Sequence, residues 1–213
     1  MGKLSWDGVG ERIYETGVDH GVLYVMDEDG YGRGVPWNGL PAVTDADNVV
    51  YLSLVSAEEF GGTIEAFTCP PEFSACDGLA EPSNGLTVGQ QTRSTFGLSY
   101  RTKVGNDLAG QDAGYKLHLV YGLLASPSEK AYQTVNDSPE AMTLSWEVTS
   151  TPIPVNDALK PTSIITVDST KVDAADLAAL EKLLYGAPAG NGGTPAQTFA
   201  KLPLPAAVLA IFA

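Results

Sequence analysis

The sequence predicts a mainly β fold, a β-sandwich or barrel-like body with one flanking α-helix at about residues 173–185. Two observations favour this class. Apolar and polar residues alternate in several short segments, which is typical of strands that bury one face. Glycine and proline are abundant, with 23 and 14 of the 213 residues, and they separate these segments as turn residues do.

The alternating segments predict about eight or nine strands. In the clearest segment, 141–150, one face is apolar: Met142, Leu144, Trp146 and Val148. In 94–102 the apolar face is Phe96, Leu98 and Tyr100, and in 115–124 it is Leu117, Leu119, Tyr121 and Leu123. Segments 21–26 and 49–55 are apolar on both faces, as buried strands are. Further strands are expected at 61–69 and 163–169, and a loop over 103–116.

One segment changes to a helical period. Asp173 is a suitable N-cap, an apolar stripe follows at Leu177, Leu180 and Leu184, and Gly186 stands where a helix ends. We therefore expect one domain over residues 1–186. Residues 187–213 form a flexible Gly/Pro/Ala linker and an apolar C-terminal arm, which either folds back on its own domain or docks on a neighbouring copy.

The charge balance excludes several functions. Twelve Lys and Arg against 26 Asp and Glu give a net charge of −14, too few cations for a basic face that binds nucleic acid or an anionic membrane. The first ten residues have no apolar run, and no segment has the length of a membrane span. Cys69 and Cys76 are expected to be reduced thiols, with a disulfide as the alternative.

The stretch from Met26 to Leu40, MDEDGYGRGVPWNGL, resembles a ligand loop at first sight. As a calcium loop starting at Asp27 it fails, because Asn38 takes the place of the bidentate Glu. As a phosphate loop it has the wrong glycine spacing, and proline follows where a helix should begin. We interpret the stretch as a tight loop after a buried strand, with glycines for unusual φ and Trp37 as a packing anchor.

No catalytic pattern is convincing. Residues 97–101, GLSYR, lack the second glycine of a nucleophile elbow. His20 and His118 are distant from each other and from the cysteines, so no zinc pattern exists, and His118 is interpreted as a sheet-face residue. Paired acids of a glycosidase remain open, with these candidates: Glu58, Glu59, Glu65 and Glu147. We expect no enzyme, no metal and no cofactor.

Long parts of the chain closely resemble the major tail protein, or tail tube protein, of long-tailed phages and prophages of Gram-positive bacteria. The resemblance is carried in order by residues 6–40 (WDGVGERIYETGVDHGVLYVMDEDGYGRGVPWNGL), 56–78, 89–107, 114–153 and 166–186, and by LPLP at 202–205. It implies a tube subunit whose strands join an inner β-barrel shared between copies, in hexameric rings that stack into a hollow tube.

The resemblance also implies partners and a location. Genomic DNA passes through the tube without specific binding, and the other partners are the tape measure, tail terminator and distal tail proteins. The location is the virion tail, assembled in the host cytoplasm. On the strands expected to form the barrel (57–68, 92–103, 115–124 and 141–150), the lumen-facing candidates are Thr63, Glu65, Ser145 and Glu147. The candidates for a subunit or ring contact are Tyr31, Arg33 and Trp37.

Two alternatives remain. The chain is another virion or tail-derived particle component, or it is a stand-alone ligand-binding β-sandwich. A tube subunit forms regular hollow rods, whereas a ligand-binding module stays monomeric, so electron microscopy of the purified protein distinguishes them.

Overall fold

The computed structural model describes residues 13–27, 30–36, 60–66, 69–106, 110–127, 144–156, 158–188 and 197–213. Over these residues the chain is mainly β, with an antiparallel sheet and two α-helices, which confirms the predicted class. The strands are β1 (Ile13–Asp27), β2 (Gly30–Pro36), β3 (Gly61–Ala66), β4 (Ala80–Ser83), β5 (Leu86–Val88), β6 (Phe96–Asn106), β7 (Gly110–Pro127), β8 (Leu144–Ser150) and β9 (Ile164–Asp168). The helices are the 3-10 helix η1 (Pro71–Ala75), α1 (Ala174–Tyr185) and α2 (Pro205–Ile211).

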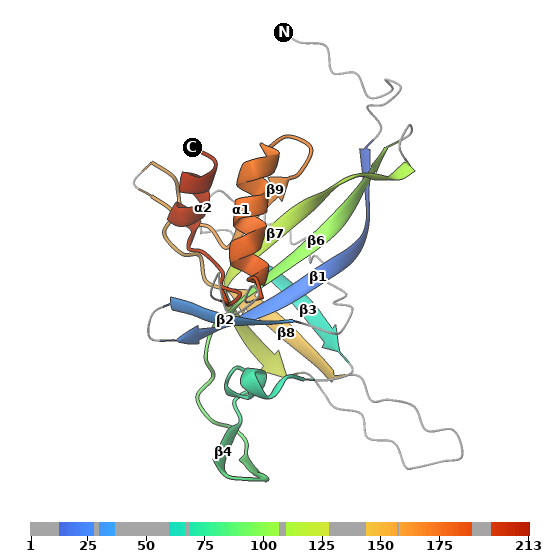
Figure 1. Cartoon of the computed structure of the whole chain (residues 1–213). Helices are drawn as coiled ribbons and strands as arrows, with labels where there is room; N and C mark the ends of the chain where they lie inside the picture. The colour runs from blue at the N-terminus through green and yellow to red at the C-terminus, as the bar shows by residue number, and fades with distance from the viewer. Residues whose placement is uncertain are drawn as a thin grey trace, which may run out of the picture.

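The main sheet has the strand order β2-β1-β6-β7-β8-β3, and β9 also pairs with β7 (Figure 1). The long strand β7 serves two partners on one edge: residues 116–120 pair with β9 and residues 123–127 pair with β8. All these pairs are antiparallel. β4 and β5 form a separate two-stranded sheet.

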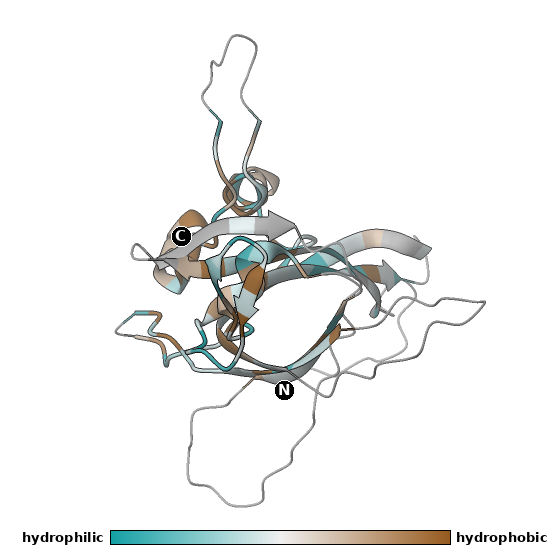
Figure 2. Ribbon diagram, turned by 90° about the horizontal axis from the view of Figure 1, so that it is seen from below, coloured by the Kyte–Doolittle hydropathy of each residue, from teal (hydrophilic) through white to brown (hydrophobic). Residues whose placement is uncertain are grey.

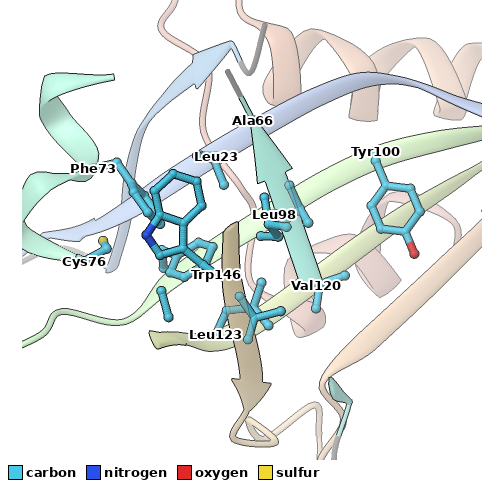
Figure 3. Close-up of a cluster of buried hydrophobic side chains, with 13 residues drawn as sticks. Leu23, Ala66, Phe73, Cys76, Leu98, Tyr100, Val120, Leu123 and Trp146 are labelled. Atoms are coloured by element: carbon cyan, nitrogen blue, oxygen red, sulfur yellow. The ribbon is translucent and has the colours of Figure 1, made fainter. Parts of the chain in front are cut away.

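Two cores lie on opposite faces of the central strands. The first core joins β1, β6 and β7 to β3, β8 and η1, and Figure 3 shows Trp146 beside Phe73 within it. The second core joins the other face of β1, β7 and β9 to the helices α1 and α2. Hydrophobic and hydrophilic residues follow one another along the strands (Figure 2), as expected for faces in different environments.

A β-bulge at Gly122 reverses which face of β7 the odd-numbered residues occupy. Gly122 has φ +62°, and the register with β6 shifts between the pairs Phe96–Leu123 and Leu98–Val120. Leu117, Leu119 and Tyr121 consequently lie in the second core, whereas Leu123 lies in the first. The prediction that Leu123 shares a face with these three residues is wrong, because the extra residue of a bulge breaks simple alternation.

The predicted helix is confirmed as α1. The Asp173 side chain accepts a hydrogen bond from the Ala175 N–H at 2.8 Å, as an N-cap does. Leu177, Leu180 and Leu184 are buried against the sheet. Gly186 follows with φ +70°, a conformation that favours glycine at the end of a helix.

Residues 197–213 fold back onto the second core. The Lys201 N–H donates to the Leu183 carbonyl at 2.8 Å, and the Gly34 N–H donates to the Ala200 carbonyl at 2.8 Å. Leu202 and Val208 are 1% exposed. The arm ends in α2, a helix that the sequence analysis did not predict, and linker residues 189–196 lie outside the described residues.

Of the stretch from Met26 to Leu40, the described residues 26–27 and 30–36 belong to the paired strands β1 and β2 and not to the predicted loop, since Asp27 pairs with Gly30. The absence of a side chain at Gly34 allows Tyr24 and Ala200 to pack against its backbone, because a Cβ there would lie 2.6 Å from the Tyr24 ring and 3.0 Å from Ala200. The predicted loop 103–116 is also wrong, because β6 continues to Asn106 and β7 begins at Gly110. The expected strand at 49–55 lies outside the described residues.

Candidate assembly surface

The four predicted lumen residues lie together on one polar face of β3 and β8. Thr63 pairs with Glu147 and Glu65 pairs with Ser145. Ile64 and Trp146, which alternate with them, are only 2% and 1% exposed in the first core. Glu65 and Glu147 are exposed, and Thr63 and Ser145 are half-buried. The face therefore points away from the core, as the alternation predicted.

The polar face continues onto β7, and contacts on the opposite, core side of β8 hold it in position. Ser126 of β7 pairs with Glu147 and is exposed. On the core side, the Trp146 indole N–H donates to the Asp77 carboxylate at 2.7 Å, and the ring meets Phe73 edge-on at 5.4 Å. These contacts fix the orientation of β8, and with it the outward direction of Ser145 and Glu147.

Strand β3 lies at the end of the sheet. The Ser150 N–H donates to the Phe60 carbonyl at 2.9 Å, and the Phe60 N–H donates to the Ser150 hydroxyl oxygen at 2.8 Å. The backbone groups of Phe60 therefore face β8, and those of every second residue after it along β3 do the same. The backbone groups of Gly61, Thr63 and Glu65 are therefore directed away from β8. No strand among the described residues pairs with this outer edge, so it offers hydrogen-bond donors and acceptors to another chain.

The predicted contact residues Tyr31 and Arg33 belong to β2, the strand at the opposite end of the sheet. Trp37 lies outside the described residues. Their role in a subunit or ring contact stays a prediction.

A charged cluster that the sequence analysis missed ties the sheet to α1. The Arg101 guanidinium contacts Asp19 on β1 at 2.9 Å and Glu181 on α1 at 3.7 Å. The Tyr115 hydroxyl donates to Glu181 at 2.7 Å. Burial, followed by the contact with Glu181, raises the pKa of Tyr115 to about 12. The cluster fixes the helix on the sheet, and its chemistry is that of a structural ion network.

His118 of β7 lies beside residues of the neighbouring strands β6 and β9. His118 stacks on Tyr100 with ring centroids 4.7 Å apart, and its two ring nitrogens lie near the hydroxyls of Thr102 and Thr166 at 2.9 and 3.1 Å. Burial lowers the pKa of His118. These contacts agree with its interpretation as a sheet-face residue.

Of the glycosidase candidates, Glu65 and Glu147 lie on an exposed sheet face. A cavity of about 760 Å³ opens elsewhere and is lined by parts of β1, β2, the end of α1 and the arm. Glu58 and Glu59 lie outside the described residues.

The cysteines are both thiols, as expected. Cys76 is buried, and burial, with a smaller effect of the neighbouring Cys69, raises its pKa to about 12. Over the described parts of the chain, no group of three or more His, Cys, Asp and Glu residues is placed to hold a metal ion. None of the described helices has the length and apolar character needed to cross a membrane.

Comparisons with models of known protein families, with curated proteins and with solved structures gave no match to this chain.

Proposed function

We propose that this chain is the subunit of a phage tail tube, in which hexameric rings stack into a hollow tube that conducts DNA into the host. The proposal starts from the sequence resemblance. The observation that carries it further is the outer edge of β3, which borders the polar face of Thr63, Glu65, Ser145 and Glu147. An edge strand of this kind is completed by a strand of a second copy, and a closed ring of copies leaves no edge.

The polar face suits the wall of a water-filled lumen. Wide barrels have polar interiors, and this face carries hydroxyls and two carboxylates on the side away from the first core. A ring of six chains at −14 has a net charge of −84. A lumen of that sign repels phosphates, which limits adhesion of DNA as it moves. In this role the chain needs no cofactor, and its protein partners are those that the resemblance implies.

The test is a proline on the outer edge of β3. Thr63→Pro removes an N–H that points away from β8, so the pairing with β8 is retained while pairing with a second copy is blocked. Thr63→Val keeps the N–H and serves as the control. Negative-stain electron microscopy of purified wild-type protein and Thr63→Val is expected to show hollow tubes, and Thr63→Pro is expected to show none.

Circular dichroism and thermal unfolding establish whether the proline variant is folded, and Glu65→Pro supplies a second site on the same edge. Normal tubes from a folded proline variant would show that this edge is not the contact. A wild-type chain that forms no hollow particle under any condition would refute the tube function.

The ligand-binding alternative is favoured by one observation, the cavity of about 760 Å³, which has the size of a small-molecule site. A chain with this function stays monomeric. The same microscopy therefore separates the two functions, because the monomeric module forms no tubes.

A further inference from the structure

The β4–β5 hairpin forms an exposed projection that we call the finger, residues 80–93. Every residue in this range is exposed, and Figure 1 shows β4 projecting below the body of the molecule. Asn84-Gly85 makes the turn, with Gly85 at φ +79° and its N–H bonded to the Glu81 carboxylate at 2.7 Å. An isolated two-stranded hairpin is marginal in water, so the finger needs support.

The base of the finger is anchored to the core. The Gln91 N–H donates to the Gly78 carbonyl at 2.9 Å, and the Ser94 N–H donates to the Ala75 carbonyl at 3.1 Å. η1 holds this base, because Phe73 and Cys76 are in the first core. Gln90 has φ +61°, which is costly for a residue with a side chain. A conformation held in this way positions the tip of the finger.

The tip of the finger carries two exposed apolar side chains and no charge. Leu86 and Val88 are 55% and 42% exposed and lie on the same side of β5. The eleven residues 82–92 include no charged side chain. Two chains that each carry −14 repel one another, so uncharged surfaces are where copies approach at least electrostatic cost.

The cavity of about 760 Å³ described above is a surface on the same chain that suits the tip of the finger. Its walls include apolar and small residues from β1, β2, the end of α1 and the arm, namely Val22, Gly34, Ala187, Pro188, Phe199 and Ala200. Phe199 is 54% exposed there. The acid on the rim, Asp19, is already paired with Arg101. The cavity therefore presents a largely neutral, apolar wall that accepts aliphatic side chains.

We propose that the finger of one copy inserts Leu86 and Val88 into this cavity of the next copy. The contact joins two different surfaces of the same chain, so it repeats from copy to copy and leads to a ring or a filament. The proposal rests on the tube function and adds a second contact to the one at β3.

The first test replaces the apolar tip. The double variant Leu86→Asp, Val88→Asp is expected to raise the protein concentration needed for assembly by about tenfold or more, measured by sedimentation velocity. The matched control is Leu159→Asp, because Leu159 is 53% exposed but lies outside the finger and the cavity. The control is expected to change the threshold by less than about twofold. Equal effects of the two variants would overturn the proposal.

The second test identifies the receiving surface. Leu86→Cys and Gln197→Cys are made separately in a Cys69→Ser background, where the remaining Cys76 is buried. After mixing and mild oxidation, the expected product is a disulfide between the two variants, identified by mass spectrometry. A dominant product between two Leu86→Cys chains would instead indicate a contact between fingers and would overturn the proposal.

The outcomes also separate this proposal from the tube function. Tubes that form normally without a disulfide between Leu86→Cys and Gln197→Cys would refute the finger contact and leave the tube function standing. A wild-type chain that is monomeric under all conditions would refute both.

Discussion

The Arg101 guanidinium donates to both carboxylate oxygens of Asp19, with N–O distances of 2.9 and 3.2 Å. The two side chains are 18% and 33% exposed, so water screens the pair only in part. The guanidinium also lies over the Tyr115 ring, 4.6 Å from its centroid. The Arg101 guanidinium therefore connects β6 to the neighbouring strands β1 and β7 and, through Glu181, to α1.

The Arg101–Asp19 pair predicts a loss of stability in acid. Burial raises the pKa of Asp19, but the hydrogen bonds and charge of Arg101 outweigh burial, so the pKa is lowered. The stabilisation is present above the ordinary carboxyl pKa of about 3.9 and is lost as the pH falls through the lowered pKa. Asp19→Asn is expected to reduce the free energy of unfolding by about 1–3 kcal/mol at pH 7.

Urea unfolding at pH 7, 5 and 3 checks this prediction. The difference between Asp19→Asn and wild type should shrink between pH 5 and 3, because acid removes the same interaction in wild type. Glu72→Gln, at an exposed position, is the control and should differ little from wild type. A difference for Asp19→Asn that is constant over this pH range would contradict the account.

Two tyrosines with buried hydroxyls predict different responses to loss of the hydroxyl group. The Tyr24 hydroxyl donates to the Leu184 carbonyl at 2.9 Å and lies 3.2 Å from the Ser99 hydroxyl. The Tyr185 hydroxyl is buried and has no hydrogen-bond partner among the described residues. Tyr24→Phe leaves the Leu184 carbonyl without its donor and should cost about 1–3 kcal/mol. Tyr185→Phe removes an unsatisfied group and should be neutral or slightly stabilising.

Denaturant unfolding of the two tyrosine variants, with the same atom removed from each, gives a direct comparison. If Tyr185→Phe proved as destabilising as Tyr24→Phe, the hydrogen-bond assignment would be wrong.

The sequence pattern predicted the features of the fold that depend on residues close together in the sequence, such as strand faces and helix limits. The outward direction of Thr63, Glu65, Ser145 and Glu147 followed from alternation, because β3 and β8 are regular. The limits of α1 followed from its cap and stripe. The Asn84-Gly85 turn was also readable, since Asn-Gly between two short extended runs is a strong hairpin signal. It was not predicted, because the two flanking runs have only four and three residues and β4 carries no large apolar side chain.

Other features depend on contacts between distant residues and were not predictable in this way. The change of face along β7 at Gly122 can be recognised only once β7 is known to lie between two cores. The partners of Arg101 lie 82 residues before it, at Asp19, and on α1, at Glu181. Whether the arm packs on its own chain or on another copy was also not predictable. Its apolar residues indicate that the arm is buried, but not against which surface.

Gly122 predicts a strong effect of adding one methyl group. Its φ of +62° is unfavourable for other residues, and an added Cβ would overlap the carbonyl oxygen of Thr151. Gly122→Ala should therefore cost more than about 3 kcal/mol, or prevent folding, through strain and overpacking. Gly61→Ala is the matched control, because its Cβ would meet its nearest atom, the Val148 carbonyl oxygen, at an ordinary 3.7 Å.

Thermal unfolding and soluble yield compare the two glycine variants. A stable, well-expressed Gly122→Ala protein alongside a destabilised Gly61→Ala protein would show that the bulge is not built as described.

The arm predicts a contrast between two leucines that are two positions apart. Leu202 is 1% exposed in the second core, whereas Leu204, at the start of α2, is 53% exposed. Leu202→Ala removes buried methyl groups and leaves a cavity beside α1, so it should lower the free energy of unfolding by about 2–5 kcal/mol. Leu204→Ala should change it by less than about 0.5 kcal/mol. Urea unfolding of both variants measures the contrast.

If the arm packed on another copy instead of its own chain, the effect of Leu202→Ala would depend on protein concentration, because unfolding would then include dissociation. An effect that is the same at low and high concentration supports packing within one chain.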